Sequence, residues 1–390
     1  MMYNLRYYQK EASDAAVKLF NGKTDKNGLI IIPTGGGKSL ILADIASRLE
    51  GPLLVFQPSK EILQQNFAKL QSYGIIDCGC YSASVGRKDI NRITFATIGS
   101  VMNNMRDFDC FKNIIVDEAH YVNSKAGQYK MFIEAKNRQV VGLTATPYRL
   151  DKCAGGSMLK FLTRTRPRIF SKVIYCCQIG ELLSKGFLAN LSYYDITSID
   201  LRRVRSNSTG ADYDEKSLIA EYERSGFYDK LSNTVVKVMQ PKSGIPRKGI
   251  LVFTAFRKES ESLVSKLQSL GIKAAIVTCD TPKREREDIL QRFKKGEIKV
   301  VSNCGTLTTG FDYPELDTVI LARPTKSLAL FYQMVGRAIR PSEGKIGWVV
   351  DMAGNYSRFG NVADLYIARP PGTTRWDVYS RGRQLTSTIL

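Results

Sequence analysis

The glycine-rich run Pro33–Ser39 (PTGGGKS) contains the residue types that bind the phosphates of a nucleotide. It lies between an apolar segment at 29–32 and a helical pattern at 40–49. Glycines allow successive backbone N–H groups to point at one phosphate, and the start of the following helix adds a partial positive charge. We expect Lys38 to reach the β- and γ-phosphates of ATP and the Ser39 hydroxyl to bind Mg²⁺. We expect Thr34, Gly35, Gly36 and Gly37 to bind the phosphates through the backbone of the loop.

Two adjacent carboxylates, Asp117 and Glu118, follow the apolar segment Ile114–Val116. In a parallel sheet they would lie at the carboxyl edge, where open α/β folds bind their ligands. We expect Asp117 to hold the Mg²⁺, directly or through water, and Glu118 to position and activate the attacking water. Combined with the loop around Lys38, the pair predicts hydrolysis of ATP rather than a solvated turn.

The elements that would position these residues are short apolar segments rich in β-branched residues, which alternate with helical patterns. Continuous apolar runs predict strands buried on both faces of a parallel sheet, and the alternation predicts a doubly wound α/β fold. Helical patterns occur at 39–49, 59–72 and 283–295. The expected strands form two series, 29–32, 53–56, 93–97, 114–116 and 140–143, then 250–253, 274–277, 299–301, 318–321 and 347–350.

The two series predict two α/β lobes separated by a stretch of different character. We place the first lobe, with the phosphate loop and the carboxylates, at 1–150 and the second at 246–365. Residues 151–245 are expected to form a basic connector that ends in a linker rich in proline and glycine. Residues 366–390 are expected to be a loop-like tail.

The charge balance indicates a polyanionic partner. The chain has 390 residues, with 57 Lys and Arg against 37 Asp and Glu, and a net charge of +20. Clustered cations neutralise phosphates and release counterions, so nucleic acid is the favoured partner over a merely basic surface. Residues 151–250 hold 17 basic and 10 acidic residues, the densest net charge in the chain. The connector is therefore a candidate accessory nucleic-acid surface.

Histidine and cysteine counts exclude several kinds of site. His120 is the single histidine, which excludes HExxH zinc proteases and Cys₂His₂ fingers. The eight cysteines contain no CxxC pair, so buried reduced thiols and a reducing compartment are expected. The N-terminus lacks a secretory signal, and no apolar run reaches the ~18 residues of a membrane span. We expect a soluble, cytoplasmic protein.

Asp117-Glu118-Ala119-His120 resembles the DEAH box of superfamily-2 helicases, with the phosphate loop as their motif I. Further stretches resemble other motifs of that superfamily in the expected order: Leu5–Gln9 the adenine-recognition motif, Thr144–Pro147 motif III, Thr309–Pro314 motif V and Gln333–Arg340 motif VI. The resemblance covers about residues 3–356. It implies two RecA-like lobes with an ATP cleft between them, and ATP and Mg²⁺ as cofactors.

The resemblance also implies roles for individual residues. Arg6 and Gln9 would contact the adenine, and Gly310 and Asp312 would contact the nucleotide from the second lobe. Coupling of the ATP site to nucleic acid is implied for His120, Thr144, Thr146 and Gln333.

More narrowly, the chain is similar to RadD-type DNA repair helicases. This similarity rests on Leu5–Gln9, Leu143–Leu150, Leu307–Asp312 and Asp351–Asn355. Such proteins commonly carry a C-terminal cysteine-rich zinc region, whereas no cysteine follows Cys304 here.

Motif VI makes physical sense as a charge clamp. Arg337 and Arg340 are three residues apart, so we expect them on one face of a helix. Guanidinium groups that arrive from the facing lobe would stabilise charge on the transferred phosphoryl group. Binding of ATP would then close the lobes, and hydrolysis would release them.

Nucleic-acid contacts are expected where small hydroxyls and helix starts follow strands. Gln57–Lys60 and Thr97–Ser100 resemble helicase motifs Ia and Ib, and Thr254–Arg257 follows the first strand of the second lobe. Each could instead be an ordinary helix N-cap. The candidate contacts to phosphates are Ser59, Lys60, Thr97, Ser100, Thr254 and Arg257.

Together these patterns predict an ATP-dependent DNA helicase or translocase in repair or recombination. It would act, as a monomer, on single-stranded or forked DNA. Three alternatives remain open: the motor subunit of a restriction system, an RNA helicase, and an ATP-gated clamp or annealing module.

Overall fold

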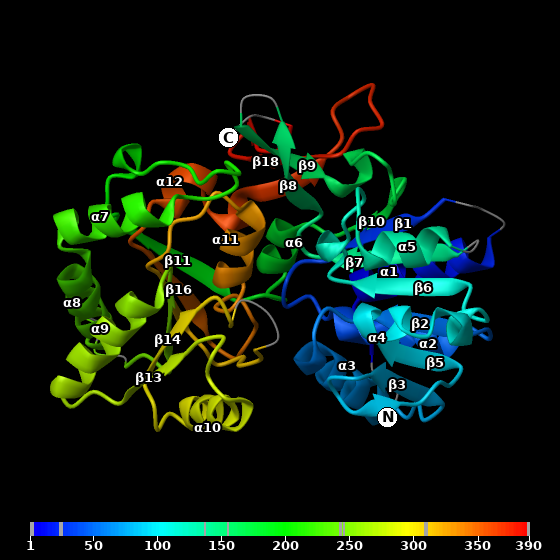
Figure 1. Ribbon diagram of the computed structural model, residues 1–390, viewed down its shortest axis with the longest axis horizontal. Coiled ribbons are helices and arrows are strands. Elements are labelled where there is room, and N and C mark those ends of the chain that lie inside the picture. Colours follow the sequence, from blue (N-terminus) through cyan, green and yellow to red (C-terminus); the bar gives the residue numbers. More distant parts are fainter. Residues whose placement is uncertain are drawn as a thin grey trace. The chain divides into compact units, whose positions relative to one another are not determined.

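The computed structural model describes residues 4–22, 26–135, 138–153, 156–241, 244, 246–307 and 311–387 (Figure 1). It divides into two compact units. Unit 1 comprises Met1–Arg149, Lys160–Ile179 and Ile367–Val378. Unit 2 comprises Leu150–Leu159, Gly180–Tyr366 and Tyr379–Leu390.

Unit 1 is built on a sheet with strand order β10-β1-β7-β6-β2-β5-β3-β4. The strands are parallel except for the β3–β4 pair, and the central strands are buried along their whole length. Their bounds are β1 Gly28–Ile31, β2 Leu53–Phe56, β3 Cys78–Ser82, β4 Arg87–Lys88, β5 Ile93–Ala96, β6 Asn113–Asp117, β7 Gln139–Thr144 and β10 Lys172–Cys176.

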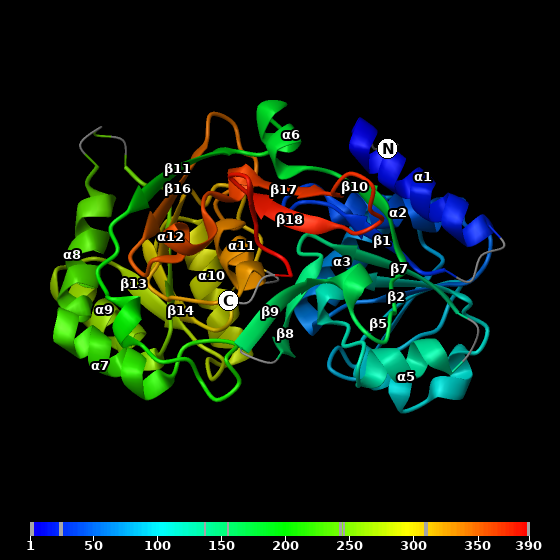
Figure 2. The same cartoon turned by 90° about the horizontal axis from the view of Figure 1, so that it is seen from above.

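The helices of unit 1 follow strands of its sheet, except the first one, which precedes β1. They are α1 Tyr7–Asn21, α2 Lys38–Arg48, α3 Lys60–Ser72, α4 Ile98–Met102 and α5 Gln128–Glu134. Helix α1 packs against α2 and β10 (Figure 2). Because α2 starts directly after β1 and its loop, the phosphate loop lies at the carboxyl edge of the sheet.

Unit 2 contains a second parallel sheet with strand order β11-β16-β15-β12-β14-β13. Its strands are β11 Asn190–Asp195, β12 Ile250–Thr254, β13 Ala274–Val277, β14 Val300–Cys304, β15 Thr318–Leu321 and β16 Ile346–Asp351. Its helices are α7 Glu215–Ser225, α8 Phe227–Met239, α9 Arg257–Ser269, α10 Lys283–Lys294, α11 Leu328–Val335 and α12 Asn355–Phe359, and α6 spans Ile179–Ser184. Apolar side chains of α7, α8 and α9 share one core with β12, β15 and β16.

These sheets confirm the expected α/β class and both series of strands. The order β1-β7-β6-β2-β5 shows crossovers between parallel strands, as a doubly wound fold requires. Strands outside both expected series form two smaller sheets: β8 Tyr148–Cys153 with β9 Gly156–Phe161, and β17 Leu365–Ala368 with β18 Asp377–Ser380 and β19 Arg383–Gln384.

Residues 151–245 do not stand apart as a connector. Strand β10 pairs with β1 in the sheet of unit 1, whereas β11 pairs with β16 in the sheet of unit 2. The segment is therefore divided between the two units, because its short strands complete the edges of both sheets.

The expectation of a loop-like tail is wrong for its described part. Strands β18 and β19 form an antiparallel pair there. Val378 and Leu385 are buried. Such isolated apolar side chains give no periodic signal in the sequence.

None of the helices in the described part of the chain has the length and apolarity that a membrane span requires.

Candidate active site

The phosphate loop links β1 to α2 and depends on left-handed backbone. Gly35 and Gly37 have φ of 82° and 80°. A Cβ atom at Gly37 would also collide with the side-chain amide of Gln9. Glycine at position 37 thus meets two requirements at once, a positive φ and a close approach.

The start of α1 is held against this loop by two side chains. Gln9 Nε2 donates to the Gly36 carbonyl at 3.0 Å, and the Tyr8 hydroxyl donates to the same oxygen at 2.9 Å. Gln9 Oε1 accepts from the Arg6 backbone N–H at 2.9 Å. The structure therefore brings Gln9, one of the two expected adenine contacts, to the phosphate loop, and the other, Arg6, contacts Gln9 through its backbone. Sequence reasoning missed Tyr8, although its neighbours were singled out.

The paired carboxylates lie where β6 ends, as expected. Asp117 is the last residue of β6 and is 3% exposed, and Glu118 has a φ of 49°. A non-glycine residue in the left-handed region is strained, and such strain gathers at functional sites. The Lys38 ammonium contacts Glu118 Oε1 and lies 3.8 Å from Asp117 Oδ1. The lysine of the loop and both carboxylates thus form one cluster.

Burial acts differently on the two carboxyl groups. It raises the pKa of Asp117 to about 6, although Lys38 lowers that pKa. Burial also raises the pKa of Glu118, but Lys38 and His120 together outweigh it and hold this pKa below its ordinary value. Glu118 is therefore the more readily ionised carboxyl group, as a base needs to be.

Asn66 on α3 joins the expected metal ligands, and sequence reasoning missed it. Its Oδ1 accepts from Ser39 Oγ at 2.6 Å, and its Nδ2 donates to Asp117 Oδ2 at 3.2 Å. The same Nδ2 donates to Gln57 Oε1 at 3.1 Å. One amide thereby orients the loop hydroxyl, the strand carboxylate and the side chain that starts the Gln57–Lys60 stretch. Its position in the middle of a helix gave no signal in the sequence.

The residues present fit Mg²⁺. Magnesium prefers hard oxygen ligands and retains several waters, so two protein oxygens suffice. Ser39 Oγ and Asp117 Oδ2 contact the same Asn66 amide and so lie close together. They are the residues that would hold the ion.

His120 links the carboxylates to the end of β7. Its Nδ1 lies 3.3 Å from Glu118 Oε2, 3.1 Å from Thr144 Oγ1 and 3.0 Å from Thr146 Oγ1. Both threonines are buried. Three of the four residues expected to couple the ATP site are therefore in contact with each other, and His120 among them also contacts Glu118.

In unit 2, the expectation that Arg337 and Arg340 share a helical face is wrong. Helix α11 ends at Val335, so both arginines follow it. They nevertheless point to the same stretch, because Arg337 Nη1 donates to the Phe311 carbonyl and Arg340 Nη1 contacts Asp312. Gly310, expected beside Asp312, lies outside the described residues.

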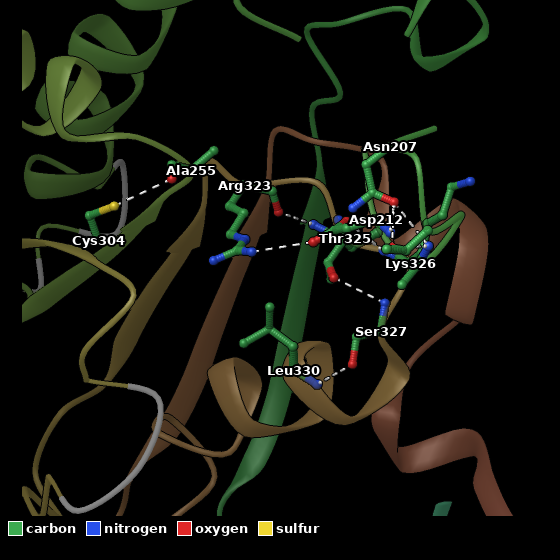
Figure 3. Close-up of polar contacts among 12 residues, drawn as sticks. Asn207, Asp212, Ala255, Cys304, Arg323, Thr325, Lys326, Ser327 and Leu330 are labelled. Carbon is green, nitrogen blue, oxygen red and sulfur yellow. Dashed lines mark hydrogen bonds and ion pairs between the residues drawn. The ribbon is translucent and has the colours of Figure 1, made fainter. Parts of the chain in front are cut away.

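Gln333 lies on α11, whose start is fixed by hydroxyl groups (Figure 3). Ser327 Oγ accepts from Leu330 N at 3.2 Å, and Thr325 Oγ1 accepts from Ser327 N at 3.0 Å. Asp212 braces the same segment through Arg323 at 3.3 Å. A loop of the expected connector thus helps to set the direction of α11.

The candidate nucleic-acid residues of unit 1 lie at helix starts. Ser59 caps α3 by accepting from Ile62 N at 3.3 Å, and Lys60 Nζ donates to the Ser84 carbonyl. The Thr97 and Ser100 hydroxyls are 3.0 Å apart, and Ser100 also accepts from Ala83 N. Strands β2 and β5 are neighbours in the sheet, so the two stretches lie side by side.

Thr254 does not suit a phosphate contact. It is 1% exposed, and its hydroxyl bonds to Ser260 Oγ at 2.8 Å and to the Asn303 carbonyl at 3.2 Å. The expectation is wrong because the last residue of β12 turns its side chain into the core. Arg257 is exposed but pairs with Glu261 at 2.7 Å and Asp280 at 3.4 Å.

Two family models match the chain. "Type III restriction enzyme, res subunit" matches residues 2–149, and "Helicase conserved C-terminal domain" matches residues 232–342. The two matches occur in the order in which the motifs I to VI follow each other. The chain belongs to the superfamily-2 helicases. Helicases of this superfamily are ATP-dependent, which implies ATP and Mg²⁺ as cofactors.

Relatives of this superfamily-2 helicase come from several kinds of organism. The Saccharomyces cerevisiae protein named "Putative ATP-dependent helicase IRC3" is 28% identical over 366 residues, which is 87% of this chain and 50% of the yeast protein. The "DNA 3'-5' translocase XPB2" of Sulfurisphaera tokodaii is 24% identical over 371 residues, which is 87% of this chain and 79% of the archaeal protein. The helicase thus spans half the length of the yeast relative.

A solved structure supports the fold of this superfamily-2 helicase. The ATP-dependent Type ISP restriction-modification enzyme LlaBIII bound to DNA aligns with a TM-score of 0.68 at 19% identity. The alignment covers 90% of this chain and 28% of that enzyme. The expected RecA-like fold of the parallel-sheet lobes is therefore confirmed.

Proposed function

We propose that this superfamily-2 helicase is a nucleic-acid-stimulated ATPase that translocates along DNA and separates strands in repair or recombination. The observation that carries the proposal is the cluster in which Lys38 contacts Glu118 and approaches Asp117. A lysine on a phosphate loop beside a metal-binding carboxylate and an ionised base is the constellation that hydrolyses a nucleoside triphosphate.

In the proposed reaction, Lys38 binds the phosphate oxygens and Glu118 orients the attacking water and accepts its proton. Mg²⁺ held by Ser39 and Asp117 would neutralise charge on the phosphates. Asn66 keeps those two ligands together through its hydrogen bonds. Arg337 and Arg340 are proposed to stabilise charge on the transferred phosphoryl group.

Coupling to nucleic acid is proposed to run through His120. Its imidazole contacts both Glu118 and the two threonines that follow β7, so a change at the base would shift Thr144 and Thr146. Ser59, Lys60, Thr97 and Ser100 are the proposed phosphate contacts of unit 1, because they lie on neighbouring strand ends.

Nucleic acid as the partner is supported by the charge of +20 and by the relatives. The Sulfurisphaera tokodaii relative is named a DNA translocase, and LlaBIII was solved bound to DNA. We therefore propose DNA ahead of RNA.

The test measures ATP hydrolysis alone and with single-stranded DNA, duplex DNA, forked DNA and RNA. We expect DNA to stimulate turnover most. Glu118→Gln should lower turnover by about 10²–10⁴-fold, the typical contribution of a general base, while nucleotide binding is retained. Lys38→Ala should lose both turnover and nucleotide binding. Equal turnover with and without every nucleic acid would refute the motor, and stimulation by RNA alone would refute the DNA assignment.

A second candidate, the motor of a restriction system, is favoured by the family model that matches residues 2–149 and by the likeness to LlaBIII. Both functions predict translocation. Displacement of a labelled strand from forked DNA by the purified chain supports the helicase. Translocation on duplex DNA without strand displacement favours the restriction motor instead.

A further inference from the structure

A pocket of about 670 Å³ lies in unit 2, and none of the residues that line it belongs to helicase motifs I to VI. Residues of α8, β11 and β16 line it, and β11 and β16 are the two strands at one edge of the second sheet. This volume falls in the range of pockets that hold a small molecule or a single nucleotide.

One wall of the pocket consists of flat, delocalised side chains. Tyr194 and Trp348 are stacked, with ring centroids 5.2 Å apart and an interplanar angle of 12°. The Arg247 guanidinium lies 3.9 Å from the Trp348 ring centroid. Tyr194 is 48% exposed because β11 is an edge strand, so part of this stack is open to a further planar group.

Helix α8 supplies positive charge to the pocket. Lys230, Thr234 and Lys237 line the pocket from α8, and their spacing of four and three residues places them on one face of that helix. In the described part of the chain neither lysine has a salt-bridge partner. Together with Arg247 they give the lining three cationic side chains, and none of the residues in the lining is a carboxylate.

These walls match the two halves of a nucleotide. Every nucleobase can stack on aromatic and guanidinium planes, so this contact does not depend on the nucleotide sequence. Lysines can bind the phosphates beside the base. An acidic peptide would satisfy the lysines but would leave the flat stack without a matching surface. The charge and the aromatic wall together therefore favour nucleic acid.

We propose that this pocket is an accessory site that holds an unstacked nucleotide of single-stranded nucleic acid, with its base against Tyr194 and Trp348 and its phosphates on Lys230 and Lys237. The inference rests on the proposed function only in that nucleic acid is the partner. It assigns a role to the basic segment 151–245, which contributes Tyr194 and both lysines.

The chain itself provides a reporter, since Trp348 and Trp376 are its two tryptophans. In a full-length Trp376→Phe background, Trp348 is the sole indole. Titration with oligothymidylate, without ATP, should quench its fluorescence saturably. Adding Tyr194→Ala should weaken this binding about 5- to 100-fold, the usual effect of removing one stacking partner.

The lysines are tested by salt dependence. Lys230→Gln with Lys237→Gln should lower the slope of log K against log salt by about 0.7 for each phosphate that the protein no longer neutralises. Lys266→Gln with Lys273→Gln removes the same charge from exposed lysines outside the pocket and should leave the quench and its midpoint unchanged.

Three results would overturn the proposal. Binding of oligothymidylate seen by anisotropy without any quench of Trp348 places the strand elsewhere, and refutes the pocket while leaving the motor intact. Equal quenching by poly-glutamate points to an acidic protein segment instead. Equal weakening by the control pair means that only overall charge matters. Failure of the motor itself is distinguishable, because it appears as absent stimulation of ATP hydrolysis.

Discussion

At the scale of single residues, the site depends on one amide that carries no charge. Asn66 uses its carbonyl for Ser39 and its amino group for Asp117 and Gln57. Groups that orient metal ligands affect the affinity for the metal through the ligands they hold in place. In the proposed mechanism Asn66 is accordingly a positioning residue rather than a catalytic one.

We predict that Asn66→Ala lowers the apparent affinity for Mg²⁺, or the turnover at fixed Mg²⁺, by about 10- to 100-fold. The measurement is a titration of ATPase activity with Mg²⁺. Gln64→Ala changes an exposed neighbour on the same helix and should have no effect. If excess Mg²⁺ does not restore any activity to Asn66→Ala and its folding is intact, the positioning role is wrong.

Glu259 is a second residue whose environment has a measurable consequence. It is fully buried at the start of α9, and its Oε2 accepts from Phe256 N at 2.7 Å. Within the described residues its Oε1 has no hydrogen-bond partner. Burial raises the pKa of Glu259 to about 8.

The pKa of Glu259 is higher in the folded state than in the unfolded state. Its full contribution to the free energy of unfolding is therefore present at low pH. It is lost as the pH rises from about 4.5 to about 8, at about 1.4 kcal/mol per pH unit. We predict that Glu259→Gln, which stays neutral, is relatively more stable at pH 8 than at pH 5. Urea unfolding at several pH values measures this, with the exposed Glu285→Gln as the control. A stability difference that does not change with pH would contradict the buried neutral carboxyl.

At the scale of elements, the phosphate loop works because a strand, a turn and a helix follow each other without a gap. Gly37 is both the turn residue and the N-cap of α2. The start of α1 closes the loop from the side through Gln9. The loop is therefore shaped by two helices, only one of which is its neighbour in sequence.

We predict that Gly37→Ala weakens ATP binding by at least about tenfold, since strain of about 1–2 kcal/mol adds to the collision with Gln9. Gly74 is a matched control, because its φ is 80° while a Cβ there meets open space. Gly74→Ala should lower the melting temperature but leave binding of a fluorescent ATP analogue unchanged. Equal effects of both variants on binding would show that the collision is irrelevant.

At the scale of the whole molecule, the C-terminal segment is part of the fold. Asp377 pairs with Arg164 at 2.7 Å, across 213 positions of sequence. Val378 and Leu385 are buried as well. The start of β18 is thus held by a residue far away in the chain, and β19 pairs with β18.

We predict that truncation after Gly372 lowers the free energy of unfolding by about 3–6 kcal/mol from the two buried apolar side chains alone. Thermal and urea unfolding measure this change. A chain that ends at Ser387 keeps β18 and β19 and should unfold like the full chain. Unchanged unfolding after the longer truncation would mean that these strands do not stabilise either unit.

The sequence alone determined the α/β class, both series of strands, the phosphate loop and the carboxylates at the end of β6. These features are local: a run of apolar residues or a glycine-rich turn is visible within a few neighbouring positions. The positions of Lys38 and Glu118 followed, because parallel strands place their carboxyl ends at one edge.

Only the tertiary structure decided the contacts that join distant positions. Asn66 meets Asp117, Thr254 turns inward, and Tyr194 meets Trp348, none of which leaves a periodic signal in the chain. An exposed edge strand such as β11 has no apolar run to reveal it, and a buried tail needs only a few anchoring side chains. The edge strand and the buried tail depend on which surfaces of the two large sheets other elements leave uncovered. Those surfaces exist only in the folded chain.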